Sequence, residues 1–177
     1  MHVSKSAKVS SIFKQSYEGK LQSLESSILN EDPETYRSEI DHLINEKQEE
    51  EIFLRGAMFK REVPRLYNNK CYISMLGIDE MVGISMIDAC HIIPFSKSHN
   101  DTITNGISLC PNLHRAFDRG LITINEDYHV VVSQKFKESS SNYSIRQFEG
   151  VQISLPENRD YWPLTSNLTW HAQNVFQ

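Results

Sequence analysis

Two histidines of this 177-residue chain lie among residue types that could together hydrolyse a phosphate ester. His91 lies three residues after Asp88 in a predicted strand, and His114 precedes Asp118 by four residues in PNLHRAFD, a predicted short helix. A spacing of four places His114 and Asp118 on one helical face, where both can reach one cation. Phosphodiester hydrolysis needs a base that deprotonates water and a cation that stabilises charge on the phosphate. Imidazole, with an ordinary pKa of about 6.5, suits the base.

Helices and short strands must position these residues. Residues 16–48 show apolar spacings of three and four, which predict two amphipathic helices joined by a turn at 30–33. A third helix, 52–63, is expected to end at Pro64. The later part predicts short strands at 71–74, 84–93, 107–110, 121–125, 129–133 and 151–156, a helix at 111–118 and a C-terminal helix around 168–176. We therefore predict an α+β fold, with a helical N-terminal arm over residues 1–50 and the remainder, 51–177, as a second domain.

The composition is that of a globular protein, with 39% hydrophobic and 23% charged residues. Three cysteines without a Cys-x-x-Cys pair favour free thiols and a cytoplasmic location. No apolar run approaches the roughly 20 residues of a membrane span, and no secretory signal is visible. The net charge is −5, yet residues 60–119 carry +1 while the flanking segments carry −4 and −2. The middle segment therefore permits a phosphate-binding surface.

The stretch DACHIIPFSKSHNDTITNGISLCPNLHRAFDRGLITI closely resembles the HNH endonucleases, the ββα-metal nucleases. The resemblance rests on an ordered signature: His-Ile-Ile-Pro at 91–94, Asn-Gly at 105–106 and Leu-His-x-x-Phe-Asp-x-Gly at 113–120. It is strongest toward bacterial HNH restriction endonucleases and extends from about Arg55 to the C-terminus. It implies a ββα-metal core with extra strands and a C-terminal helix, and it makes 51–177 a nuclease domain.

The resemblance also implies a role for each matching residue. His91 is the expected general base at the end of the first strand. Asn105 is expected to tie the long loop to the strands and so to orient that base. His114 is the expected metal ligand on the helix, and Asp118 a further ligand one turn later. Many relatives place an Asp or His directly before the base, where this chain has Cys90.

Cys90 leaves the ligand from the strand open. Asp88 lies two residues earlier, on the same face of an ideal strand, and is our preferred substitute. With Asp88, His114 and Asp118 as ligands, we expect one hard divalent ion, Mg²⁺ or Mn²⁺. A thiolate ligand from Cys90 would instead favour Zn²⁺, and Ni²⁺ also stays open.

Each of these residues also has a plainer explanation. His91 could be a core histidine at a strand end, and His114 with Asp118 could be an exposed pair of little energetic weight. The three cysteines could join His114 in a structural zinc site, although a second half-site is not visible. The ordered spacing of His91, Asn105 and His114 favours the nuclease interpretation.

The function that we predict is a metal-dependent endonuclease that hydrolyses DNA. Restriction or anti-phage defence is implied by the resemblance alone. The alternative is a catalytically silent module that keeps the fold to bind nucleic acid or a protein, which the unusual Cys90 favours. The helices of residues 16–48 could also pair two copies in a homodimer. Four basic side chains near the site suit contacts with DNA phosphates: Arg115, Arg119, Lys97 and His99.

Overall fold

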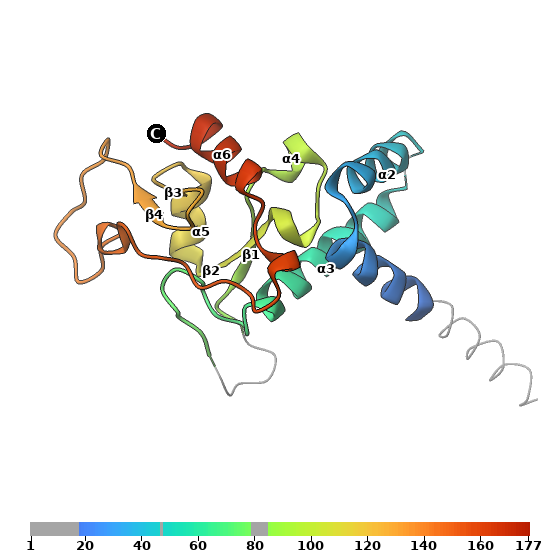
Figure 1. Cartoon of the computed structure of the whole chain (residues 1–177), viewed down its shortest axis with the longest axis horizontal. Helices are drawn as coiled ribbons and strands as arrows, with labels where there is room; N and C mark the ends of the chain where they lie inside the picture. Colours follow the sequence, from blue (N-terminus) through green and yellow to red (C-terminus); the bar gives the residue numbers. More distant parts are fainter. Residues whose placement is uncertain (1–17, 47, 79–84) are drawn as a thin grey trace, which may run out of the picture.

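The computed structural model describes residues 18–46, 48–78 and 85–177 of the chain. Its N-terminal part is a helical arm (Figure 1), in which residues 18–30 form one helix and α2 (Pro33–Asn45) the next. The Asp32 carboxylate caps α2 by accepting a hydrogen bond from the Thr35 backbone N–H. The predicted helical hairpin is therefore confirmed, apart from residues 16, 17 and 47, which lie outside the described residues.

Helix α3 (Glu49–Leu66) joins the arm to the rest of the molecule, because it contacts both α2 and the strands that carry the site. It passes through Pro64, where a break was predicted, so that prediction was wrong. Proline removes one backbone hydrogen bond, a loss that matters less in a last turn than in mid-helix. The buried side chains of Phe59, Glu62 and Val63 hold the end of the helix against the body.

A ββα unit follows α3 and carries most of the predicted site. Strand β1 (Asp88–His91) pairs antiparallel with β2 (Gly106–Leu109), and α5 (Pro111–Asp118) follows β2 directly. The connection between the strands contains the short helix α4 (Phe95–Ser98) and the 3-10 turn η1 (Ile103–Asn105). The strand predicted for 84–93 is thus shorter, and its first residue lies outside the described residues.

Gly106 lies opposite His91 in the β1–β2 ladder, at the point where α3 crosses the strands. A Cβ atom at this position would lie 2.6 Å from Cγ2 of Val63 and 2.9 Å from Cε2 of Phe59. Because nothing larger than hydrogen fits here, glycine lets α3 approach the ladder closely. This contact brings Phe59 to His91.

The C-terminal part closes the molecule around the ββα unit (Figure 1). Strands β3 (Ile122–Ile124) and β4 (Val130–Val132) form the predicted hairpin, and α6 (Thr165–Asn174) packs on β3. The 3-10 turns η2 (Arg146–Phe148) and η3 (Arg159–Tyr161) lie between β4 and α6. The result is the predicted α+β fold, with a ββα unit, an extra hairpin and a C-terminal helix.

Two predicted strands are replaced by other structure. Residues 71–74 belong to a tight turn, in which the Cys71 N–H donates to the Leu76 carbonyl and the Met75 N–H to the Cys71 carbonyl. The apolar pattern misled the prediction because the turn buries Cys71 and Tyr72 as a strand would. Residues 151–156 contribute only an isolated bridge, from Gln152 to His129. Across the described part of the chain, no helix is both long and apolar enough to cross a membrane.

Candidate active site

Three of the residues predicted to do chemistry line one cleft of about 260 Å³: His91, His114 and Asp118. Its walls come from the end of β1, from α4, from α5 and from the C-terminal helix. Its lining residues are His91, Ile92, Pro94, Phe95, His114, Asp118, His171 and Val175. A larger hollow of about 510 Å³, beside the end of α3, contains none of the predicted site residues. The fold therefore brings the predicted base and the predicted helix ligands to the same cleft.

His91 is held at its edge and on its face. Its Nε2 lies 2.7 Å from Oδ1 of Asp101. Its ring stacks on Phe59, with the centroids 3.9 Å apart and the planes 10° from parallel. Asp101 and Phe59 are buried, whereas the His91 side chain is 23% exposed. Because Nε2 faces Asp101, Nδ1 is the ring nitrogen left to accept a proton.

Asn105 fastens the loop that follows β1 and is fully buried. Its Oδ1 accepts from the Ile93 N–H, and its Nδ2 donates to the carbonyls of Ile93 and Asn100, all at 3.0 Å. The Asn167 amide on α6 also donates to Asn105 Oδ1, at 3.2 Å. These contacts fit a residue that ties the loop to the strands, and its effect on the base stays a prediction.

His114 lies between two carboxylates. Its Nδ1 is 3.3 Å from Oδ2 of Asp88, and its Nε2 is 3.4 Å from Oδ2 of Asp118. The strand side chain of Asp88 therefore faces α5, as the alternation of β1 predicted. The two carboxylates nevertheless meet opposite nitrogens of one ring. A cation bound through one of these nitrogens has one carboxylate next to it and the other across the ring.

Cys90, His114 and Asp118 each place one ligand atom within 4.8 Å of the others, and no other such group of three is found among the described residues. Ligand bonds of about 2.0–2.3 Å put the ligands of one ion within roughly 4.6 Å of each other, so the group fits a cation after slight closure. Asp88 is not in this group. Its predicted ligand role is not decided by the geometry and stays a prediction.

The Cys90 thiol is fully buried and donates to Oδ1 of Asp118 at 3.7 Å. Burial, and then the negative charge of Asp118, raise the pKa of Cys90 well above its ordinary value. Without a metal the thiol is therefore protonated at neutral pH. In that form it is a hydrogen-bond donor to Asp118, whereas a metal ligand would have to be the thiolate.

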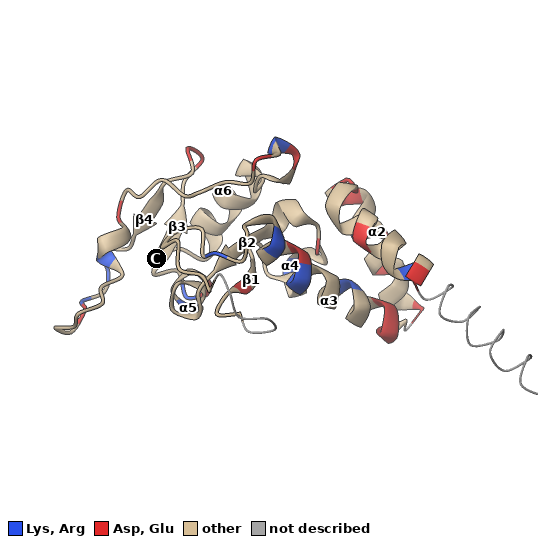
Figure 2. Ribbon diagram, turned by 90° about the horizontal axis from the view of Figure 1, so that it is seen from below, with Lys and Arg blue, Asp and Glu red and all other residues tan. Residues whose placement is uncertain are grey.

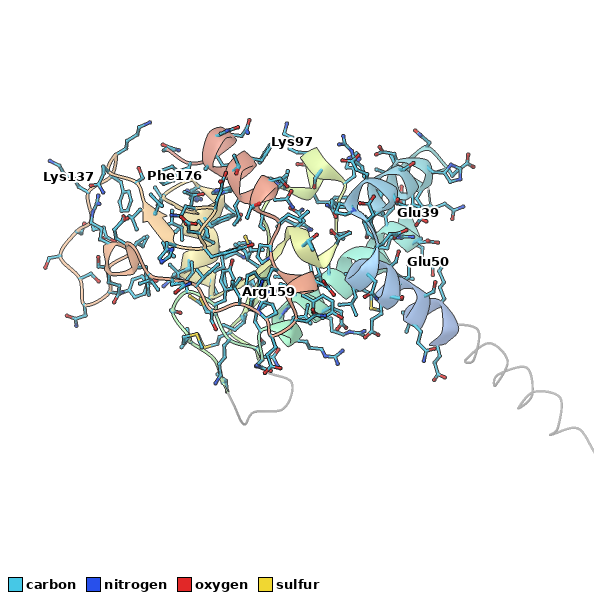
Figure 3. All side chains as sticks on the ribbon, viewed as in Figure 1. Glu39, Glu50, Lys97, Lys137, Arg159 and Phe176 are labelled. Carbon is cyan, nitrogen blue, oxygen red and sulfur yellow. The ribbon has the colours of Figure 1, made fainter. Side chains whose placement is uncertain are left out.

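The residues predicted to contact DNA lie on or beside two helices that contribute to the cleft. Arg115 and Arg119 are exposed on and just after α5, and Lys97 is exposed on α4 (Figure 3). His99 differs, because its Nδ1 lies 2.6 Å from Oδ1 of Asp41 on α2 and so links α4 to the arm. Figure 2 shows that acidic residues concentrate on the arm, while α5 carries basic ones. The charge pattern therefore favours an anionic partner at α5 over one at the arm.

His171 of α6 also lines the cleft, although no role was predicted for it. Its Nδ1 lies 2.9 Å from Oγ1 of Thr123 and its Nε2 lies 3.1 Å from the Phe117 carbonyl. Its ring stacks on Phe117, with centroids 3.6 Å apart. Burial lowers the pKa of His171 to about 4, so it is neutral at pH 7. It forms part of the wall with both nitrogens occupied.

Comparison with known proteins points to the same segment. A family model described as HNH endonuclease matches residues 71–125. Among solved structures, the chain is similar to a "Modification dependent TagI restriction endonuclease", with 22% sequence identity and a TM-score of 0.50. The similarity covers 67% of this chain and 38% of that chain, so this chain spans well under half of that relative's length. At this identity the likeness concerns the fold alone. No curated protein matches the chain.

Proposed function

Residues 71–125 match a family model of the HNH endonucleases, and from this match we propose that the chain is a metal-dependent endonuclease that hydrolyses phosphodiester bonds of DNA. One observation carries the proposal. The same cleft contains His91, whose ring is held with one nitrogen free, and the pair His114 and Asp118, which fits a cation. A base and a cation site on one cleft are the parts that this hydrolysis needs.

In this proposal His91 is the general base. Asp101 occupies Nε2, so Nδ1 takes the proton from the water that attacks the phosphorus in line. The stacked ring of Phe59 fixes the plane of the imidazole and hence the direction of the Nδ1 lone pair. Asn105 keeps the chain after β1 in place and supports this orientation indirectly.

His114 and Asp118 would hold one divalent cation, and Asp88 or Cys90 would complete the protein ligands. When bound, the cation supplies positive charge that stabilises the oxygens of the pentacovalent transition state and the leaving 3′ oxygen. With Asp88 as the third ligand, the ion would be a hard one such as Mg²⁺ or Mn²⁺. A Cys90 thiolate would instead suit Zn²⁺, and Ni²⁺ would also accept the imidazole.

Basic residues around the cleft bind the DNA backbone in this proposal. Arg115, Arg119 and Lys97 are exposed and free to contact phosphates, while His99 contributes through the edge of its ring that faces away from Asp41. A role in restriction or anti-phage defence is part of this proposal and rests on the resemblance of the signature to bacterial restriction endonucleases. Free thiols at all three cysteines support a cytoplasmic location.

The arm, residues 1–50, is assigned to packing and oligomerisation and residues 51–177 to the nuclease domain. A homodimer through the arm would present two sites to the two DNA strands, as double-strand breaks require of a single-site nuclease. Ile44 on α2 and Phe53 on α3 are 40% and 74% exposed, which supports a further contact there. We expect a dimer by light scattering at protein concentrations on the order of tens of micromolar. A monomer that makes double-strand breaks would refute the dimer.

The deciding experiment is incubation of supercoiled plasmid with the chain and Mg²⁺, Mn²⁺, Ni²⁺ or Zn²⁺. We expect cleavage with at least one ion and none after addition of EDTA. A His91→Ala chain purified in the same way is the control for a contaminating nuclease. Binding of DNA without cleavage under every metal would replace this proposal with the silent binding module that Cys90 suggests.

A further inference from the structure

Asp101 is a buried carboxylate that the sequence did not single out. It lies between α4 and η1, is 2% exposed, and places Oδ1 2.7 Å from Nε2 of His91. Burial of a carboxylate is unfavourable unless it is paired, and about 2.7–2.9 Å is the distance of a charge-assisted hydrogen bond. We infer that Asp101 is a positioning residue that orients the catalytic imidazole of His91. This inference rests on the proposed function.

The carboxylate can orient the ring because it only accepts hydrogen bonds. A neutral imidazole has one N–H and one lone pair, and which nitrogen carries the proton is set by the partner of the other edge. With Asp101 at Nε2, that nitrogen carries the proton and Nδ1 keeps the lone pair that the base requires. Without Asp101, the proton can move to Nδ1, or the ring can turn over about its Cβ–Cγ bond. Either change removes the lone pair from its working position.

The backbone around Asp101 is fixed from within its own loop. The Thr102 N–H donates to Oδ1 of Asn100 at 2.8 Å, and Asn105 donates to the Asn100 carbonyl at 3.0 Å. Asn105 therefore holds the residue before Asp101 as well as the residues after His91. The same hydrogen bonds of Asn105 therefore fasten the loop after β1 and hold Asp101 beside His91.

A buried tyrosine of the helical arm lies close enough to Asp101 to be influenced by its charge. Tyr36 of α2 is fully buried, and the guanidinium of Arg55 lies 5.0 Å from the centre of its ring. Burial and the negative charge of Asp101 both raise the pKa of Tyr36, as expected if its hydroxyl faces the region of Asp101. Phe59 on α3 covers one face of the imidazole, and Asp101 itself is 2% exposed. The carboxylate of Asp101 is therefore less screened than one at the surface.

The test compares three substitutions at Asp101 with a control elsewhere. Asp101→Asn keeps the shape and removes the charge, Asp101→Ala removes the acceptor, and Asp101→Glu keeps a carboxylate. Asp127→Asn removes an exposed charge in the turn between β3 and β4 and is the matched control. Steady-state cleavage of a labelled oligonucleotide duplex gives kcat and KM for each, and thermal unfolding shows which variants are folded.

We expect Asp101→Ala and Asp101→Asn to lower kcat by about 10²-fold or more while KM changes by less than about threefold, since a positioned base acts in the transition state. Asp101→Glu should recover part of kcat, and Asp127→Asn should equal the wild type. A merely structural role would lower the active fraction and leave no partial rescue by Glu. Wild-type kcat in a folded Asp101→Asn chain would overturn the inference.

A second measurement does not depend on cleavage. The imidazole ¹⁵N chemical shifts of His91 report which nitrogen is protonated. In the neutral ring of the wild type we expect the tautomer with the proton on Nε2, and in Asp101→Ala a mixture. If no metal supports cleavage but the wild type shows this tautomer, the proposed function fails and the positioning by Asp101 stands. A proton on Nδ1 in the wild type would refute the inference even if the variants do not fold.

Discussion

The two proposed catalytic histidines of the cleft are held in different ways. His91 has a buried carboxylate at 2.7 Å and a buried aromatic ring on its face. His114 has only the carboxylates of Asp88 and Asp118, at 3.3 and 3.4 Å, and these side chains are 50% and 54% exposed. Exposed pairs of this kind fix a geometry weakly. In the proposed function, the base is therefore held in place before any ligand binds, whereas a cation would complete the other half of the site.

His91→Ala tests the preformed half and should give the largest effect. Loss of a general base typically lowers kcat by about 10²–10⁴-fold. DNA affinity should change little, because the phosphate contacts proposed for Arg115 and Arg119 would remain. Cleavage assays and fluorescence anisotropy separate the two quantities. His129→Ala, a histidine on the β3–β4 hairpin, is the matched control, and near-wild-type cleavage by His91→Ala would remove the base from the proposal.

Substitutions at Asp88 and Cys90 test the half that the cation completes. Asp88→Ala should weaken metal binding and lower activity by about 10–100-fold, whether the carboxylate binds the ion or holds the other nitrogen of His114. If Asp88 rather than Cys90 is the third ligand, Cys90→Ala should be nearly neutral, because alanine can fill the buried space of the thiol. Calorimetric titration of the EDTA-treated chain with Mn²⁺ measures the affinity directly.

The reverse pattern would change the metal. If Cys90→Ala abolishes activity and Asp88→Ala does not, the thiolate is the ligand and Zn²⁺ is the working ion. Asp118→Ala should weaken metal binding in both cases, because Asp118 lies beside Nε2 of His114 and beside the thiol. It therefore serves as the positive control for either ligand set.

His171 is a third histidine of the cleft and differs from His91 in one respect. Both of its ring nitrogens have hydrogen-bond partners, so neither is left to accept a proton. Its folded pKa of about 4 lies below the unfolded value of about 6.5. The unfolded chain therefore binds the extra proton first as the pH falls. The stability due to the neutral ring is complete above about pH 6.5 and is lost progressively down to about pH 4, by roughly 3 kcal/mol in all.

His171→Gln should therefore leave activity at neutral pH almost unchanged, the smallest of these effects. Its free energy of unfolding should fall less steeply with acid than that of the wild type, by about one proton over this interval. Denaturant unfolding at a series of pH values from about 7 to about 4 measures the difference. Parallel profiles for the two chains would mean that His171 is not held neutral.

The part of the site that follows from local periodicity could be predicted from the sequence. The helix at 111–118 has its predicted bounds, so the spacing of four between His114 and Asp118 determined their common face. Strand alternation likewise predicted that Asp88 would face α5, and it contacts His114. The side of the ring that Asp88 would meet could not be predicted, since it depends on how α5 crosses the strands.

The residues that hold the base could not be found in this way. Asp101 lies in a polar loop, where no periodicity shows which way a side chain points. Phe59 lies on a helix well before the signature, and its role depends on the close approach that Gly106 allows. The same absence of tertiary information explains the turn at Cys71, where an apolar run was taken for a strand. One signal for Asp101 was present in the sequence. It is the acidic residue in the loop between the His-Ile-Ile-Pro and Asn-Gly parts of the signature.

The loop tie at Asn105 has a consequence for the order in which the chain folds. Asn105 bonds Ile93 across 12 positions, whereas His171 reaches Thr123 across 48. Closing the longer loop costs about 1 kcal/mol more in chain entropy, and contacts between near neighbours generally form earlier. The base and the helix ligands should therefore meet while α6 is still undocked. Helix α6, which forms one wall of the cleft, then docks last, after the base and the helix ligands are in place.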